Sequence, residues 1–209
     1  MAKLRICLIA IALCLGVACS PRDFLTRRLA RDLISGSEAF NATQLFLLRT
    51  GVVSNKQYLS PEYLVLQHRG WITGGTVPCA ADKDARARAL NRGGELCWDV
   101  ALTPAGVETF RSLIPNNAEP AQYTSVPVAR RVLVDISGIS ADVNVAEVDF
   151  TWKWLPLNEV GSALYPGDVP YNSTVTFKRY DDGWRVMKYG GGQVNQDLED
   201  ALKNALPAP

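Results

Sequence analysis

Apolar and polar positions alternate through much of the second half of the chain, which is the pattern of strands with one buried face. The segments RRVLVDISGI (130–139) and VNVAEVDFTWKWLPL (143–157) both follow it. A later segment, 173–189, holds two β-rich runs separated by Asp181, Asp182 and Gly183, and Asp-Gly at that spacing is typical of a β-hairpin. Residues 116–209 are therefore expected to form an antiparallel sheet of about four strands.

The first half of the chain has helical periodicity instead. In RDFLTRRLARDLI (22–34), Leu25, Leu29 and Leu33 recur at every fourth position, which predicts an amphipathic helix that ends near Gly36. The run QLFLLRTGVV (44–53) is apolar enough for a strand or a buried helix, and its pattern does not choose between them.

Two Ser/Thr-Pro pairs mark the starts of further helices. Ser60-Pro61 and Thr103-Pro104 each place a side-chain oxygen at a helix N-cap and a proline in the first turn, which predicts helices at about 61–69 and 104–113. We therefore expect an α+β fold with a helical N-terminal half, a β-hairpin inserted in that half, and a C-terminal antiparallel sheet.

The first apolar run has the layout of an export signal. Basic Lys3 and Arg5 precede the run 6–15, and small residues follow it up to Ala18. The stretch 6–18 is shorter than the about 20 residues that a membrane-spanning helix needs.

The end of this run resembles the lipobox of bacterial lipoprotein signals, in which cleavage occurs just before a cysteine that is then acylated. Ala18-Cys19 matches that ending. The resemblance implies that residues 1–18 are a signal peptide, that Cys19 carries palmitate or a similar acyl chain, and that the protein is held to the cell envelope. Ser20 resembles the sorting signal for the outer membrane, with the protein facing the periplasm. Such signals usually carry Leu where this chain has Gly16, so ordinary signal cleavage at the same bond is the alternative.

The cysteine pattern fits a lipidated, exported chain. Of five cysteines, Cys7 and Cys14 lie in the signal, and with lipid on Cys19 the mature chain keeps Cys79 and Cys97. Paired thiols persist in oxidising compartments, so we expect a disulfide between these two. On the chain-entropy model, a loop of that size is worth about 3 kcal/mol. Two separate buried thiols are the alternative.

Residues 63–113 resemble the second half of a winged-helix domain of PadR or MarR regulators. The match runs from the helix and Gly-Trp-Ile step of YLVLQHRGWITGG to the strand and helix of CWDVALTPAGVETFRSL. In a DNA-binding version, the wing residues that contact phosphates would be Lys83, Arg86, Arg88 and Arg92. Acidic Asp82, Asp84 and Glu95 dilute this charge, and an exported protein meets no chromosome. We expect a solvated hairpin and no nucleic-acid partner.

Composition suggests a boundary but no strong charge preference. The net charge is +1 over 209 residues, which does not favour nucleic acid. The stretch LIPNNAEPAQYTSVP (113–127) is rich in proline and polar residues, and it predicts a boundary between a helical, winged-helix-like region at 19–115 and a sheet region at 116–209. The two regions are also compatible with a single domain.

Candidate catalytic residues are few. His68 is the only histidine and shares a helical face with Leu64, where a packing role is the commoner one. Asp181 and Asp182 are better explained by a hairpin turn than by acid–base chemistry. The sequence holds no nucleophile elbow, zinc-binding His-Glu-x-x-His pair or phosphate loop, so we expect no catalytic residue, metal or cofactor.

Aromatic residues of the second half are the candidates for ligand contact. Trp152, Trp154, Trp184 and Tyr180 could line a groove for carbohydrate or peptide, but aromatic side chains on one strand face equally suit a core.

These patterns favour a non-catalytic, lipid-anchored binding module whose partner is an envelope protein or polymer. The alternative is a periplasmic enzyme whose site is built from dispersed acidic and tyrosine residues. The arginines near the lipid either orient the first helix on anionic headgroups, or simply face water or pair with acids of the sheet half; they are Arg22, Arg27, Arg28 and Arg31.

Overall fold

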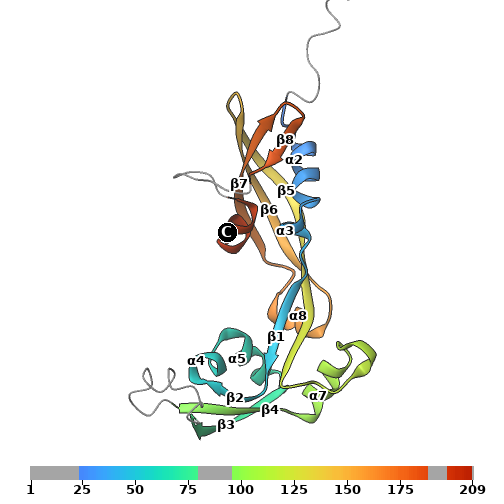
Figure 1. Ribbon diagram of the computed structural model, residues 1–209, viewed down its shortest axis with the longest axis vertical. Helices are drawn as coiled ribbons and strands as arrows, with labels where there is room; N and C mark the ends of the chain where they lie inside the picture. Colours follow the sequence, from blue (N-terminus) through green and yellow to red (C-terminus); the bar gives the residue numbers. More distant parts are fainter. Residues whose placement is uncertain (1–23, 80–95, 188–196, 209) are drawn as a thin grey trace, which may run out of the picture. The chain divides into compact units, whose positions relative to one another are not determined.

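Figure 1 shows the computed structural model, which describes residues 24–79, 96–187 and 197–208. The helices are α2 (Arg27–Ser35), α3 (Glu38–Asn41), α4 (Asn55–Tyr58), α5 (Pro61–His68), α7 (Pro104–Arg111), the 3-10 turn η1 (Pro115–Asn117), α8 (Glu159–Leu164) and α9 (Leu198–Lys203). The strands are β1 (Gln44–Arg49), β2 (Gly51–Ser54), β3 (Ile72–Pro78), β4 (Leu96–Leu102), β5 (Tyr123–Ala141), β6 (Val145–Pro156), β7 (Pro170–Tyr180), β8 (Gly183–Val186) and β9 (Leu206–Pro207).

The predicted helical N-terminal half is wrong, because the protein is dominated by antiparallel sheet. Strands make up 45% of the described residues and helices 30%, and four of the strands lie in the first half of the chain. The ambiguous run 44–53 is one reason. Phe46 and Leu48 of β1 are buried whereas Leu45 and Leu47 are exposed, which is the two-residue alternation of a strand.

The strands form two sheets. The larger sheet has the order β1-β5-β6-β7-β8, and the short β9 pairs with β7. The larger sheet therefore contains β1, from the first half of the chain, in addition to the strands predicted for the second half. The smaller sheet has the order β2-β4-β3, so β2 adds a third strand to the hairpin that the winged-helix resemblance implies.

Hydrogen-bonding side chains fix the starts of the predicted helices. The Ser60 hydroxyl accepts from the backbone N–H of Tyr63, and the Thr103 hydroxyl accepts from that of Gly106. α5 and α7 therefore begin at the prolines that the sequence indicates. α2 is also present and ends at Gly36, but its most buried residues are Ala30 and Ile34, so its buried face is displaced by one residue from the predicted leucine row.

The chain divides into two compact units, and neither is continuous in sequence. The described residues of unit 1 are 24–41, 133–152, 170–187 and 197–208, and those of unit 2 are 42–79, 96–132 and 153–169. The boundary expected near residue 115 does not separate them. Residues on both sides of it belong to unit 2, because the first part of β5 pairs with β1 there.

Unit 2 has a core between the first part of the larger sheet, the smaller sheet and its helices. Its most buried large side chains are Leu48, Val53, Leu66, Val100, Phe110, Val126 and Val128. Tyr63 of α5 lies in the same core and reaches the end of β1, where its hydroxyl meets the backbone of Arg49.

Unit 1 buries one face of the second part of β5, β6, β7 and β8. A chain of hydrogen bonds ties two of these strands to α9: the Trp152 indole N–H donates to the Ser173 hydroxyl (3.0 Å), which donates to the Ala201 carbonyl (2.9 Å). On β5, the Ser137 carbonyl accepts from Arg27, and Asp135 accepts from Arg31 at 3.2 Å. α2 is thereby held along β5.

Candidate binding surface

The three tryptophans predicted to face a ligand are core residues. Trp152, Trp154 and Trp184 are only 2%, 8% and 6% exposed. Trp152 stacks on Tyr171 with ring centroids 4.9 Å apart. The aromatic face of this sheet segment is therefore covered, which excludes these tryptophans as a preformed ligand platform.

The fourth predicted aromatic, Tyr180, is exposed beside the turn that joins β7 to β8. Lys178 and Arg185 both lie against its ring. Asp181 and Asp182 form the turn between the paired residues Tyr180 and Gly183, and Asp182 forms an ion pair with Arg185. The two carboxylates thus act as turn and ion-pair residues.

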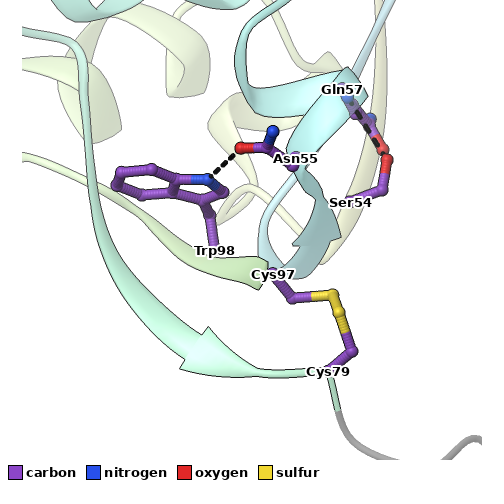
Figure 2. Close-up of a disulfide and its surroundings, with 6 residues drawn as sticks. All are labelled: Ser54, Asn55, Gln57, Cys79, Cys97 and Trp98. Atoms are coloured by element: carbon purple, nitrogen blue, oxygen red, sulfur yellow. Dashed lines mark hydrogen bonds between the residues drawn. A yellow bond between two sulfur atoms is a disulfide. The ribbon is translucent and has the colours of Figure 1, made fainter. Parts of the chain in front are cut away.

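The predicted disulfide is present in unit 2. Figure 2 shows Cys79 bonded to Cys97 where β3 ends and β4 begins. Beside it, the Trp98 indole N–H donates to the Asn55 side-chain oxygen (2.9 Å), and the same ring stacks on Tyr58 with centroids 4.1 Å apart. The disulfide and the Trp98 contacts tie β4 to β3 and to α4, so this group of residues stabilises the smaller sheet.

Several predicted residues lie outside the described part of the chain. They are the lipidation residue Cys19, the helix arginine Arg22 and the wing residues Lys83, Arg86, Arg88 and Arg92. Within the described ranges, none of the helices is both long and apolar enough to cross a bilayer.

Chemical groups of the described residues do not converge on a catalytic arrangement. His68 is exposed at the end of α5. No group of three or more His, Cys, Asp or Glu residues that could hold a metal occurs in residues 24–79, 96–187 and 197–208. Burial raises the pKa of the Tyr63 hydroxyl, but the backbone of Arg49 and the Gln57 amide occupy this group.

A polar groove of about 700 Å³ lies in unit 1, where β6 and β7 meet the end of the chain. The Asp149 carboxylate accepts from the Thr174 hydroxyl (2.6 Å), and the Thr151 hydroxyl donates to the Asn172 side-chain oxygen (3.0 Å). Asp149 is the one carboxylate among the residues that line the groove. It can hydrogen-bond a polar ligand, but it lacks the second titratable group that general acid–base chemistry needs.

An exposed apolar group of unit 2 lies on the outer face of β1 and β5. Leu45, Leu47 and Tyr123 are 56%, 56% and 54% exposed. The register places Leu45 opposite Pro127 and Arg49 opposite Tyr123, and directly opposed residues of antiparallel strands share a face. We call Leu45, Leu47, Tyr123 and Pro127 the apolar strip.

Two further features define the apolar strip. β1 is the first strand in the order of its sheet, so the strip lies at a sheet edge. The guanidinium of Arg49 lies 5.3 Å from the centroid of the Tyr123 ring, which places a cation at one end of the strip. An exposed apolar group on an edge strand is a typical site of protein association.

The comparisons with known proteins name no relative. No family model, curated protein or solved structure matches the chain.

Sequence reasoning missed the apolar strip for a physical reason. A strand with a polar outer face alternates, but Leu45 and Leu47 are apolar on the outer face while Phe46 and Leu48 are apolar on the inner face. The four residues therefore read as one continuous apolar run. The signal that could have found the surface is the flanking of this short run by polar Gln44 and Arg49, which limits it to strand length.

Proposed function

We propose that this protein is an exported envelope protein, anchored by lipid on Cys19, that binds another protein through the apolar strip. The observation that carries the proposal is the exposure of Leu45 and Leu47 on an edge strand, beside Tyr123. The proposed localisation rests on the sequence, in which an apolar run ends in Ala18-Cys19 and Ser20 favours the outer membrane.

The chemistry of the strip favours a protein partner over a polysaccharide. Leucine side chains offer no hydrogen bonds, whereas sugar hydroxyls need donors and acceptors on the protein. An edge strand also presents backbone groups to which a partner strand can add. Fully burying a leucine is worth about 1.5–3 kcal/mol, so covering the exposed parts of Leu45 and Leu47 is worth on the order of 2 kcal/mol.

The alternative, a periplasmic enzyme with dispersed acids and tyrosines, is less well supported. In the polar groove of unit 1, Asp149 is bonded to Thr174 and has no second carboxylate beside it in the lining. Tyr63 is occupied by backbone bonds.

Site-specific photo-crosslinking in the producing cell tests the binding role. A photoreactive phenylalanine analogue at position 47 is expected to give an adduct of one discrete mass with another envelope protein. The matched control is the same analogue at position 52, because Val52 is an exposed apolar residue of unit 2 on the other sheet.

Two results decide the experiment. Loss of the position-47 adduct in a Leu45→Ser background, with the protein still present at its normal level, would support the strip as the binding surface. No adduct at position 47, or equal adducts at positions 47 and 52, would overturn it.

A further inference from the structure

One end of unit 1 lies close to the point where the chain arrives from Cys19. Phe24, the first described residue, is 63% exposed and precedes α2. α2 runs antiparallel to β5, because Arg27 at its start bonds to the Ser137 carbonyl and Arg31, one turn later, bonds to the Val134 carbonyl. The start of α2 therefore points toward the turn that joins β5 to β6.

Two hairpin turns share this end of the unit. Residues 142–144 join β5 to β6, and residues 181–182 join β7 to β8. The backbone N–H of Arg179 donates to the Asn144 carbonyl (2.8 Å), which ties the turns together. α2 also contacts β8, and Figure 1 shows both turns and the start of α2 at the same end of the unit.

Three exposed side chains at this end are apolar or aromatic: Phe24, Val143 and Tyr180. Val143 is 75% exposed at the tip of its turn and Tyr180 is 44% exposed beside the other. We call Phe24, Val143, Tyr180 and the two turns the turn end. Tyrosine favours the headgroup level of bilayers, where its ring lies in the apolar layer and its hydroxyl in water.

Charge at the turn end is mixed, with five cations against three anions. The cations there are Arg27, Arg28, Lys178, Arg179 and Arg185, and the anions are Asp142, Asp181 and Asp182. Arg185 is paired with Asp182, and the arginines at 27 and 31 are bonded to β5. The excess of positive charge is small, so apolar contact is the main attraction of the turn end for a bilayer and attraction to anionic lipid is a smaller one.

The tether is short. Phe24 follows Cys19 by five residues, and a fully extended chain spans at most about 3.6 Å per residue, so the link covers no more than about 18 Å. A short link gives the tethered surface a high effective concentration at the bilayer, so that weak contacts are enough to orient it.

We propose that the turn end rests on the bilayer surface, with Val143, Tyr180 and Phe24 in the headgroup layer. This inference rests on the proposed acylation of Cys19. We propose this orientation instead of one in which the arginines of α2 face anionic headgroups, because Arg27 and Arg31 are bonded to β5.

Lipid quenching of a fluorescent label tests the orientation. The acylated full-length protein carries an environment-sensitive label on Val143→Cys, or in a second variant on Tyr180→Cys, and is reconstituted into phosphatidylcholine vesicles with and without phosphatidylglycerol. The matched control is Leu206→Cys, which is 72% exposed in the same unit. Leu206 pairs opposite Asn172, nine residues along β7 from the turn, or about 30 Å.

Spin-labelled lipids are expected to quench the labels at 143 and 180 several-fold more strongly than the label at 206. Because apolar contact is the main attraction proposed, this ratio should persist in high salt and in vesicles without phosphatidylglycerol. Acylated protein with equal quenching at all three positions, or with a ratio that collapses in high salt, would overturn the orientation alone. A Cys19 without acyl chains would overturn the anchor and the orientation with it.

Discussion

The Tyr63 hydroxyl is bonded on every side. It accepts from the Arg49 backbone N–H at 2.9 Å and from the Gln57 amide at 3.1 Å, and it donates to the Arg49 carbonyl at 2.8 Å. A phenol has one donor and two acceptor sites, so its capacity is filled. The Tyr63 side chain of α5 thereby hydrogen-bonds both the N–H and the carbonyl of Arg49, the last residue of β1.

Tyr63→Phe should destabilise the protein by about 1–3 kcal/mol, because it leaves the part-buried N–H and C=O of Arg49 without their partner. Urea denaturation at neutral pH measures the change. Tyr180→Phe, at an exposed position, is the control and should change stability by no more than about 0.5 kcal/mol. Equal stability of the two variants would contradict the role given to the hydroxyl.

The same residue predicts how stability depends on pH. Burial raises the pKa of Tyr63, and burial together with the charge of Glu62 raises that of Tyr165, each above an ordinary value near 10. Above pH 10 the unfolded chain releases these protons before the folded chain does. The free energy of unfolding should therefore fall as the pH rises from 10 toward the folded pKa values.

Urea titrations between pH 9 and about 11 check this slope. In Tyr63→Phe the fall should be shallower, since one of the two groups no longer titrates. A slope of opposite sign, with stability rising above pH 10, would show that these tyrosines ionise more readily in the folded protein.

At the scale of elements, α8 and β5 approach closely at a glycine. A Cβ atom at Gly161 would lie 1.8 Å from the Val128 carbonyl oxygen, and the Gly161 N–H is bonded to the Asn158 side chain that caps α8. Either the helix or the strand would have to move to accommodate a methyl group.

Gly161→Ala should therefore cost at least about 1–3 kcal/mol. Gly75→Ala is the matched control, since a Cβ atom there meets nothing within 4 Å and the residue also belongs to unit 2. Thermal unfolding followed by circular dichroism compares the two. If both variants melt at the wild-type temperature, α8 does not rest on β5 as described.

Elements were predictable where the sequence holds a local cause. The prolines at 61 and 104 with their capping hydroxyls fix the starts of α5 and α7, and Asp-Gly at 182–183 fixes the β7–β8 hairpin. The strand β1 was not predictable, because its outer leucines erase the alternation on which such predictions rest.

Burial of the tryptophans depends on distant parts of the chain. Alternation places Trp152 and Trp154 on one face of β6, but no local signal says what covers that face. In unit 1 the cover of this face includes α9. The Ala201 carbonyl of α9 completes the hydrogen-bond chain from Trp152 through Ser173. The apolar strip was not predictable for the converse reason. Its exposed leucines, Leu45 and Leu47, belong to a continuous apolar run that the sequence suggests is core.

At the scale of the whole molecule, the anchor decides where every other surface acts. Wild-type protein should partition into detergent and incorporate labelled fatty acid, and Cys19→Ala should abolish both, because several acyl chains hold a protein stably to a bilayer. Cys97→Ser, which breaks the disulfide but keeps Cys19, is the control and should still be labelled. Equal labelling of Cys19→Ala and wild type would contradict the anchor.

Because the two units are interleaved in sequence, they can complete their folding at different times during synthesis. All described residues of unit 2 lie between positions 42 and 169, so this unit has its full set of residues well before synthesis ends. Unit 1 begins earlier, with α2, but it also needs α9, whose Leu198, Ala201 and Leu202 are buried. Among the described residues, the packing of unit 1 therefore cannot be completed until α9 has been synthesised. Until α9 is made, Ser173 lacks its Ala201 partner and the buried faces of α9 and of β7 are left apart, so the newly made chain is most prone to aggregate during that interval.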